Sequence, residues 1–158
     1  MSKRADINAA LLKETGKAPP MRAFVHLHTH SAYSLLEGAL PLKDILARTK
    51  EDAQPAVAVT DRNNLFGALE FSQKALGEGI QPIIGCKLEV ALEPAEAAAP
   101  AFGSNQQAMR AHPTMIFLVM NATGYDNLTR LASLAHMEGA KVSRAHVTVE
   151  QVAELSDG

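Results

Sequence analysis

Three histidines fall within five positions near the start of the chain, at His26, His28 and His30. In an extended strand alternate side chains share a face, so this spacing predicts that the three imidazoles project together. Imidazole nitrogens are common metal ligands and bind zinc at about 2.0 to 2.1 Å. The segment is therefore a candidate metal site. A polar strand face whose histidines bond only to water or backbone groups has the same pattern, and the spacing alone does not separate the two.

The composition describes a globular domain. The chain has 158 residues, of which 47% are hydrophobic, and this suffices for one domain with a core. The net charge of −2 gives no overall reason to expect nucleic-acid binding. No stretch reaches the roughly 20 apolar residues that span a bilayer. The single cysteine, Cys86, excludes an internal disulfide and fits a reducing compartment, so we expect a cytoplasmic protein.

Two regions lack the pattern of packed structure. Residues 1–22 carry mixed charges and little apolar sequence, which predicts a disordered or weakly helical arm. Residues 93–114 are rich in Ala, Pro, Gly, Ser and Gln, which predicts an exposed loop. We expect residues 23–158 to form one folded unit around that loop.

Four short apolar runs predict strands, at residues 24–30, 56–60, 82–90 and 115–120. Segments with helical periodicity lie between or after most of these strands. Alternating strands and helices imply an α/β fold with a parallel sheet and right-handed crossovers. The chain stops where this alternation would lead into another strand. We therefore expect a partial domain of about four strands with an unpaired sheet edge.

The predicted helices follow from apolar spacing and from capping residues. One helix is expected at residues 41–53, another at 65–76, a third from about residue 121 to Gly139, and a short one that begins after a Thr148–Gln151 capping box. The apolar stripe of the second helix is assigned to four residues, Leu65, Phe66, Leu69 and Leu76.

Polar side chains gather where the predicted strands end. In parallel α/β folds the chemistry lies at the carboxyl ends of the strands. Three separate parts of the sequence place residues at that rim, and these are His28, His30, Asp61, Arg62, Lys87 and Glu89. The rim is the predicted functional site.

Four motifs in order, with matching spacing, make the sequence recognisable. They are HLHTHSAYSLLEG at 26–38, TDRNNLFG at 60–67, GIQPIIG at 79–85 and GYDNLTRLAS at 124–133. Together they resemble the polymerase and histidinol phosphatase (PHP) domain of the bacterial DNA polymerase III alpha subunit, over roughly residues 22–158, in its replicative rather than its error-prone branch. The resemblance implies a distorted (β/α)7 barrel, of which this chain would hold the first four strands, in an N-terminal part of the domain.

The resemblance also implies a metal cluster of zinc or manganese at the barrel rim. His28 and His30 match the His-x-His ligand pair of active members, and His26 stands where an aspartate is often found. Glu37 and Asp61 match further ligand positions of the family. These five residues are the predicted metal site.

Two departures from the family pattern argue that this site is eroded. Arg62 stands where active members have histidine, and Lys87 stands where they have glutamate. Arginine has no lone pair to offer a metal. A guanidinium about 5 Å from a divalent ion would repel it by roughly 6 to 7 kcal/mol at an effective dielectric of about 20. We expect the two cations to form ion pairs with Asp61 and Glu37 instead.

Three functions are compatible with these residues. The first is a portion of a replicative polymerase that acts as a structural platform and docks the proofreading exonuclease subunit of the replicase holoenzyme. The Mg²⁺-dependent nucleotidyl transfer and the DNA contacts would then lie outside this inactive fragment. The second is a working metal-dependent phosphoesterase, either a 3′-5′ exonuclease or a pyrophosphatase. The third is a free-standing phosphatase of the same superfamily, which the motif at 124–133 and the abrupt ending disfavour.

Overall fold

The computed structural model describes residues 24–92, 112–139 and 144–158. The predicted N-terminal arm and nearly all of the predicted 93–114 loop lie outside these residues. A four-stranded sheet forms the centre, and its strands are β1 (Ala56–Arg62), β2 (Gln81–Ala91), β3 (Thr114–Leu118) and β4 (Val147–Thr148). The α/β prediction is confirmed, and the described part of the sheet is open rather than closed into a barrel.

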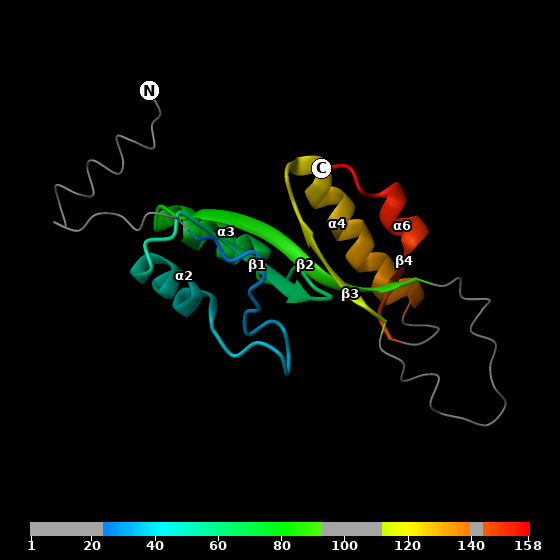
Figure 1. The fold of residues 1–158 in the computed structure, drawn as a ribbon, viewed down its shortest axis with the longest axis horizontal. Helices are drawn as coiled ribbons and strands as arrows, with labels where there is room; N and C mark the ends of the chain where they lie inside the picture. The colour runs from blue at the N-terminus through cyan, green and yellow to red at the C-terminus, as the bar shows by residue number, and fades with distance from the viewer. Residues whose placement is uncertain (1–23, 93–111, 140–143) are drawn as a thin grey trace.

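Helices flank the sheet at both of its ends. They are α2 (Leu42–Glu51), α3 (Ala68–Gly77), α4 (Ala122–Leu134), which runs on into the π-helical turn η3 (Ala135–Gly139), and α6 (Val149–Glu154). In Figure 1, α2 and α3 lie toward one end of the sheet, and α4 and α6 lie toward the other. The predicted capping box is confirmed, since the Thr148 side chain accepts from the Gln151 backbone and the Gln151 side chain accepts in return. No helix among the described residues is both long and apolar enough to span a bilayer.

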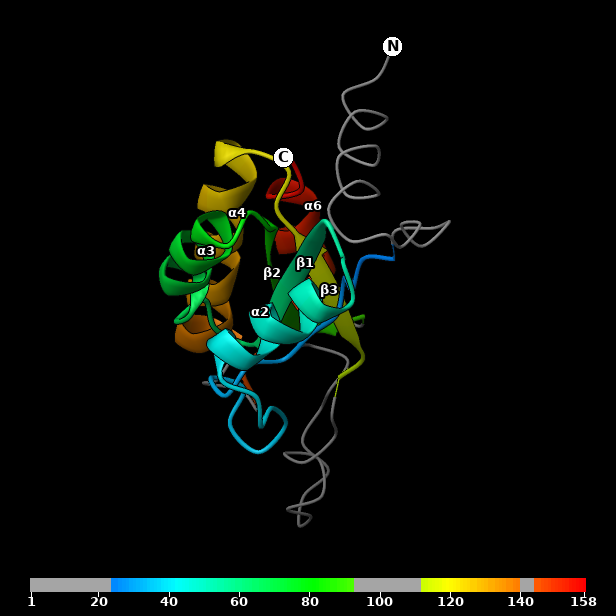
Figure 2. The ribbon, with the colours of Figure 1, turned by 90° about the vertical axis from the view of Figure 1, so that its left-hand side faces the viewer.

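Strand alternation gives the sheet two different faces. On β2, Ile84 packs against the core cluster of α2 and α3, whereas Leu88 and Val90 belong to the cluster of α4. These three residues lie an even number of positions apart, so their side chains project from the same face of β2. The helices that they contact therefore cover that face, and Figure 2 shows α3 and α4 on the same side of the strands. Lys87 and Glu89 therefore project from the other face, which we call the inner face.

The direction of β3 differs from the prediction. β1 and β2 are parallel, as expected, but β3 runs antiparallel to β2, and Glu89 pairs with Thr114. A parallel neighbour needs a crossover connection, usually a helix, whereas an antiparallel neighbour needs none. The antiparallel direction places Thr114, the first residue of β3, at the carboxyl rim of β2.

The predicted strand at residues 24–30 follows β1 without forming a regular ladder. It makes one isolated parallel bridge, between His26 and Val57. Ala58 donates its N–H to the His26 carbonyl and Thr60 donates to the Thr29 carbonyl, each at 2.8 Å. Three residues of this segment thus span two residues of β1, and the extra residue interrupts the alternation of faces, as a bulge does.

The apolar stripe predicted for the second helix is wrong for three of its four residues, whereas Leu65, which lies before α3, is half-buried and packs against the α4 cluster. The residues that α3 buries are Ala68, Phe71 and Ala75, whereas Phe66, Leu69 and Leu76 are exposed. Both sets satisfy helical spacing, so periodicity alone did not distinguish them. The large Phe71 side chain fills the space between α2 and β1, and the small alanines let the helix approach the sheet.

Replacement of Leu69 by glutamine is expected to change the free energy of unfolding by less than about 0.5 kcal/mol, because the side chain is already 70% exposed. Urea unfolding followed by circular dichroism measures this, with Leu76→Gln as a matched second variant. A loss of about 2 kcal/mol or more in either variant would mean that this stripe faces the core.

Candidate functional site at the strand ends

His28 and His30 form the centre of the predicted site. Their Nε2 atoms lie 3.1 Å apart and their rings meet edge to face at 4.9 Å. At this distance one nitrogen donates and the other accepts, so the pair is stable with at least one ring neutral. Burial lowers the pKa of His30 from its ordinary value, and the positive charge of Lys87 and the nearby His28 act in the same direction.

His26 is only loosely associated with the other two histidines. Its ring meets that of Phe24 edge to face, at 4.7 Å between centroids. All three histidines nevertheless line one wide, open hollow between their segment and α2, with a volume of about 520 Å³. The structure thus brings His28 and His30 into contact and places His26 farther along the same hollow.

Glu37 lies behind the histidine pair. Its Oε2 atom is 3.6 Å from Nδ1 of His30, on the opposite side of the ring from the Nε2 atom that meets His28. This distance is longer than a hydrogen bond. Glu37 therefore lies near His30 without fixing its ring, and on the side away from His28.

Two cations hold the Glu37 carboxylate. Arg62 donates from Nη1 to Oε1, and Lys87 donates from Nζ to Oε2 at 3.2 Å. The hydrogen bond from Arg62 is the largest cause that lowers the pKa of Glu37, and Lys87 acts in the same direction. The expected ion pairs between Glu37 and the replacement cations are confirmed.

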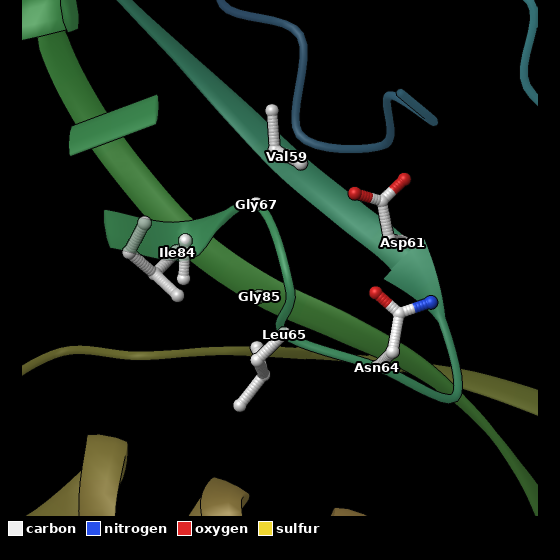
Figure 3. A pocket seen from close by; sticks show the side chains of 8 residues that line it. Val59, Asp61, Asn64, Leu65, Gly67, Ile84 and Gly85 are labelled. Carbon is white, nitrogen blue, oxygen red and sulfur yellow. The ribbon is translucent and has the colours of Figure 1, made fainter. Parts of the chain in front are cut away.

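Asp61 takes a different place from the one predicted. Its buried carboxylate accepts hydrogen bonds from the Ser31 backbone at 2.7 Å, from the Ser31 hydroxyl at 2.7 Å and from the Ser34 hydroxyl at 2.6 Å. Asp61 and Arg62 are neighbours on β1, so their side chains project from opposite faces, and Asp61 cannot join Arg62 on the inner face. Figure 3 shows Asp61 at the end of β1, beside a pocket of about 10 Å³ that Asn64 also lines. Asp61 therefore fixes the Ser31–Ser34 loop to the sheet.

Glu89 is the partner of Arg62 that sequence reasoning did not assign. Its side chain is 1% exposed, and Arg62 donates to it from Nη2. The His112 backbone N–H lies 3.3 Å from its second oxygen, and Arg144 Nε lies 3.6 Å from the first. The alternation of side chains along a strand could have predicted this role, because Glu89 lies two residues after Lys87 on β2 and so shares its face. Arg62 thus joins Glu37 of the loop to Glu89 of β2.

The carboxylates at this rim are occupied by partners from within the chain. Among the described residues, no group of three or more His, Cys, Asp or Glu side chains is arranged to hold an ion. His28 and His30 offer two convergent nitrogens, but the Glu37 and Glu89 carboxylates bind cations and Asp61 binds serine donors. Chemically, this arrangement joins the ends of β1 and β2 to the Glu37 loop through charged hydrogen bonds.

Comparisons with known proteins agree with the fold and the motifs. The sequence profile of the PHP domain matches residues 26–158, and the chain belongs to this family. Among its relatives, the DNA polymerase III subunit alpha of Caulobacter vibrioides is 42% identical over 137 residues, that of Treponema pallidum 41% over 137, and that of Thermus aquaticus 45% over 118. The matches cover 87%, 86% and 73% of this chain but only 11%, 11% and 9% of those proteins.

A solved structure gives a weaker likeness. An amidohydrolase from Chromobacterium violaceum, with bound sulfate and no metal, aligns with a TM-score of 0.45 and 20% identity, over 74% of this chain and 39% of that one. The sequence relatives are therefore the more informative comparison, and this chain spans about a tenth of their length.

Proposed function

We propose that this chain is the PHP portion of a replicative DNA polymerase alpha subunit and that it serves as a structural platform in place of a metal centre. The motifs and the 41–45% identity to polymerase subunits support the first part. The observation that carries the second is Arg62, which bridges Glu37 and Glu89 from a position where active family members have a metal-binding histidine. Polymerisation with Mg²⁺ and most contacts with DNA would belong to the remainder of the polymerase.

The ion pairs supply the cross-links that metal ions provide in active members. A metal cluster ties strand ends together through shared ligands, and Arg62 does so through two carboxylates from different parts of the chain. Lys87 adds a second tie to Glu37, from β2. A charge-assisted network of this kind holds its loops in one arrangement without needing an ion. The rim would then serve as a fixed surface within a (β/α)7 barrel that further chain completes.

Exposed leucines next to Glu37 support a docking role. Leu35 and Leu36 are 83% and 106% exposed, and Leu36 has a φ of 69°, a backbone conformation that leucine rarely adopts. Backbone strain at an exposed apolar side chain is typical of binding surfaces. We infer that this loop contributes to the contact with the proofreading exonuclease subunit within the cytoplasmic replicase.

The platform proposal is tested by restoring the ligands of active relatives. The double variant Arg62→His, Lys87→Glu is expected to bind Zn²⁺ or Mn²⁺ at least about tenfold more tightly than the natural chain, because it removes two cations and adds two ligands. Metal content after dialysis and binding isotherms with each metal measure this. The variant Lys43→Glu, at an exposed position of α2, is a control for the change of charge.

The contrary result is a natural chain that already holds a stoichiometric metal ion. Zinc or manganese that survives dialysis and is lost in His28→Ala would show that the ion pairs do not replace the cluster.

This result would favour the second candidate, a metal-dependent 3′-5′ exonuclease or pyrophosphatase. The observation in favour of that candidate is the His28–His30 pair, whose Nε2 atoms converge at 3.1 Å with Glu37 behind. Metal-dependent hydrolysis of a primer end or of pyrophosphate, abolished by His28→Ala, would support it.

A further inference from the structure

The strand β3 lies at one side of the sheet, next to β2, and the backbone along its outer edge is open. Val119, directly after β3, donates its N–H to the Ile84 carbonyl of β2 at 2.9 Å. Residues of an antiparallel strand bond alternately to one side and to the other, so the even-numbered residues of β3 point their backbone groups away from β2. Within the described part of the chain, the outward N–H and C=O groups of Thr114, Ile116 and Leu118 have no hydrogen-bond partner.

This edge lacks the features that usually keep edge strands apart. Edge strands of soluble proteins commonly carry charged residues, proline or a bulge, which prevent pairing with another chain. Residues 114–120 contain no charged residue, proline or glycine, and Met115 and Ile116 are 47% and 40% exposed. The edge also accepts a backbone partner at its end, where Met120 donates its N–H to the Gly158 carbonyl at 2.6 Å. The edge is therefore suited to pairing with an extended strand.

We propose that a second copy of the 158-residue chain pairs with this edge, β3 against β3, in antiparallel directions about a twofold axis. In such a contact each outward N–H and C=O group meets its complement on the same strand of the other copy. An edge that is uncharged and open along its length is self-complementary in this sense. The inference does not depend on the proposed function, and any other strand that took this edge would exclude the second copy.

The contacts at the end of β3 select the register. Two registers bring the outward groups together, one with Ile116 opposite itself and one with Thr114 opposite Ile116. In the first register the chain before one β3 lies against Met120 of the other copy, at the place that Gly158 already occupies. In the second register Met115 lies opposite itself at the twofold axis, and each pair of Thr114 with Ile116 exchanges two main-chain hydrogen bonds. The second register is therefore the proposed one.

The charges beside the edge fit the same register. On the inner face, Lys87 lies opposite Ile116 and Glu89 lies opposite Thr114. The proposed register thus puts Lys87 of one copy in the same cross-strand row as Glu89 of the other, at three strand spacings or roughly 14 Å. The alternative register would align the two Lys87 side chains instead. Charge complementarity adds a small preference, because salt screens charges at this distance.

The contact is small, so the association should be reversible. Stable specific interfaces bury about 1,200 to 2,000 Å², and a strand of five residues offers a short edge by comparison. We expect a dissociation constant of roughly 10 μM to 1 mM. Sedimentation equilibrium across this range should show conversion of monomer to dimer without larger species, because a twofold contact closes on itself.

The variant Met115→Lys tests the twofold contact. It places two like charges directly opposite each other, so we expect the dissociation constant to rise at least about tenfold. Met120→Lys is the matched control, because that side chain is 86% exposed and lies beyond the paired residues, and its association should be unchanged. Circular dichroism of both variants establishes that the fold is kept.

Cross-linking tests the register without weakening the contact. Met115→Cys should form a disulfide-linked dimer in a glutathione buffer, because residues opposite each other in a non-hydrogen-bonded pair have Cα atoms about 4.5 Å apart, within the range of a disulfide. Ile116→Cys meets threonine of the other copy and should link about tenfold less. The native Cys86 is buried and takes no part.

Three results would overturn the proposal. The first is a chain that stays monomeric up to about 1 mM. The second is association as tight in Met115→Lys as in the natural chain, and the third is equal cross-linking of Met115→Cys and Ile116→Cys. Association that is kept in Met115→Lys and lost in Leu69→Gln would assign the contact to the exposed apolar face of α3 instead.

Discussion

Replacement of Glu89 by alanine is expected to destabilise the folded chain by about 3 kcal/mol. The carboxylate is 1% exposed and accepts from Arg62, and its removal leaves a guanidinium on the inner face with one of its two partners missing. Breaking a buried ion pair costs about 3 to 5 kcal/mol, and the remaining Glu37 contact places this variant at the lower end. Urea unfolding at neutral pH measures the loss.

Glu37 supplies the matched control for that measurement. Its carboxylate is partly exposed and water can replace it around Arg62 and Lys87, so Glu37→Ala should cost only about 1 kcal/mol. Glu89→Gln should fall between the two, because it keeps an acceptor near the His112 N–H and loses the charge. Equal losses in Glu37→Ala and Glu89→Ala would mean that burial does not set the strength of this network.

Replacement of Asp61 by alanine is expected to cost a similar amount, about 3 kcal/mol, for a different reason. The variant leaves the Ser31 N–H and two serine hydroxyls without their acceptor, in a site from which water is largely excluded. Each unsatisfied buried donor costs about 1 to 3 kcal/mol, and hydroxyl groups can turn toward other acceptors, which limits the sum. Thermal and urea unfolding both report the effect.

A double-mutant cycle identifies the serine contacts as the cause. Asp61→Ala and Ser34→Ala should be strongly non-additive, with a coupling of about 1 to 2 kcal/mol, because each variant removes the same hydrogen bond. Asp126→Ala, on the exposed surface of α4, should change stability by less than about 0.5 kcal/mol. Additive losses from Asp61 and Ser34 would contradict the observed loop closure.

The sequence was sufficient to predict those helices and strands for which hydrophobic pattern and capping residues indicate the same structure. Ala56–Arg62 has the continuous apolar run of a strand that is buried on both faces, and α2 begins after Pro41, which suits a first helical turn. Thr148 and Gln151 predicted the start of α6 because a capping box is local to four residues. The Glu37 ion pairs were also predictable, since Arg62 and Lys87 at the rim need nearby carboxylates.

The features that sequence reasoning missed depend on register or on distant contacts. The direction of β3 was one such feature, because an apolar run such as Thr114–Leu118 has the same pattern in a parallel and in an antiparallel strand. The face of α3 was another, since Leu69 and Phe71 each belong to a set with helical spacing. The orientation of Asp61 depends on which face of β1 it shares, and the partnership of Glu89 with Arg62 depends on how β1 and β2 align. None of these is fixed by composition or by local motifs.

The antiparallel pairing of β2 and β3 has a consequence for how sequence length can vary. Glu89 and Thr114 are direct partners, so the chain that connects these strands begins and ends at the same place on the molecule. In general, each doubling of the length of a loop between two such neighbouring positions costs only about 0.6 kcal/mol of closure entropy. This position is therefore where evolution can lengthen or shorten the gene, and where an experimenter can insert a label or a protease site, with least disturbance to the rest of the domain.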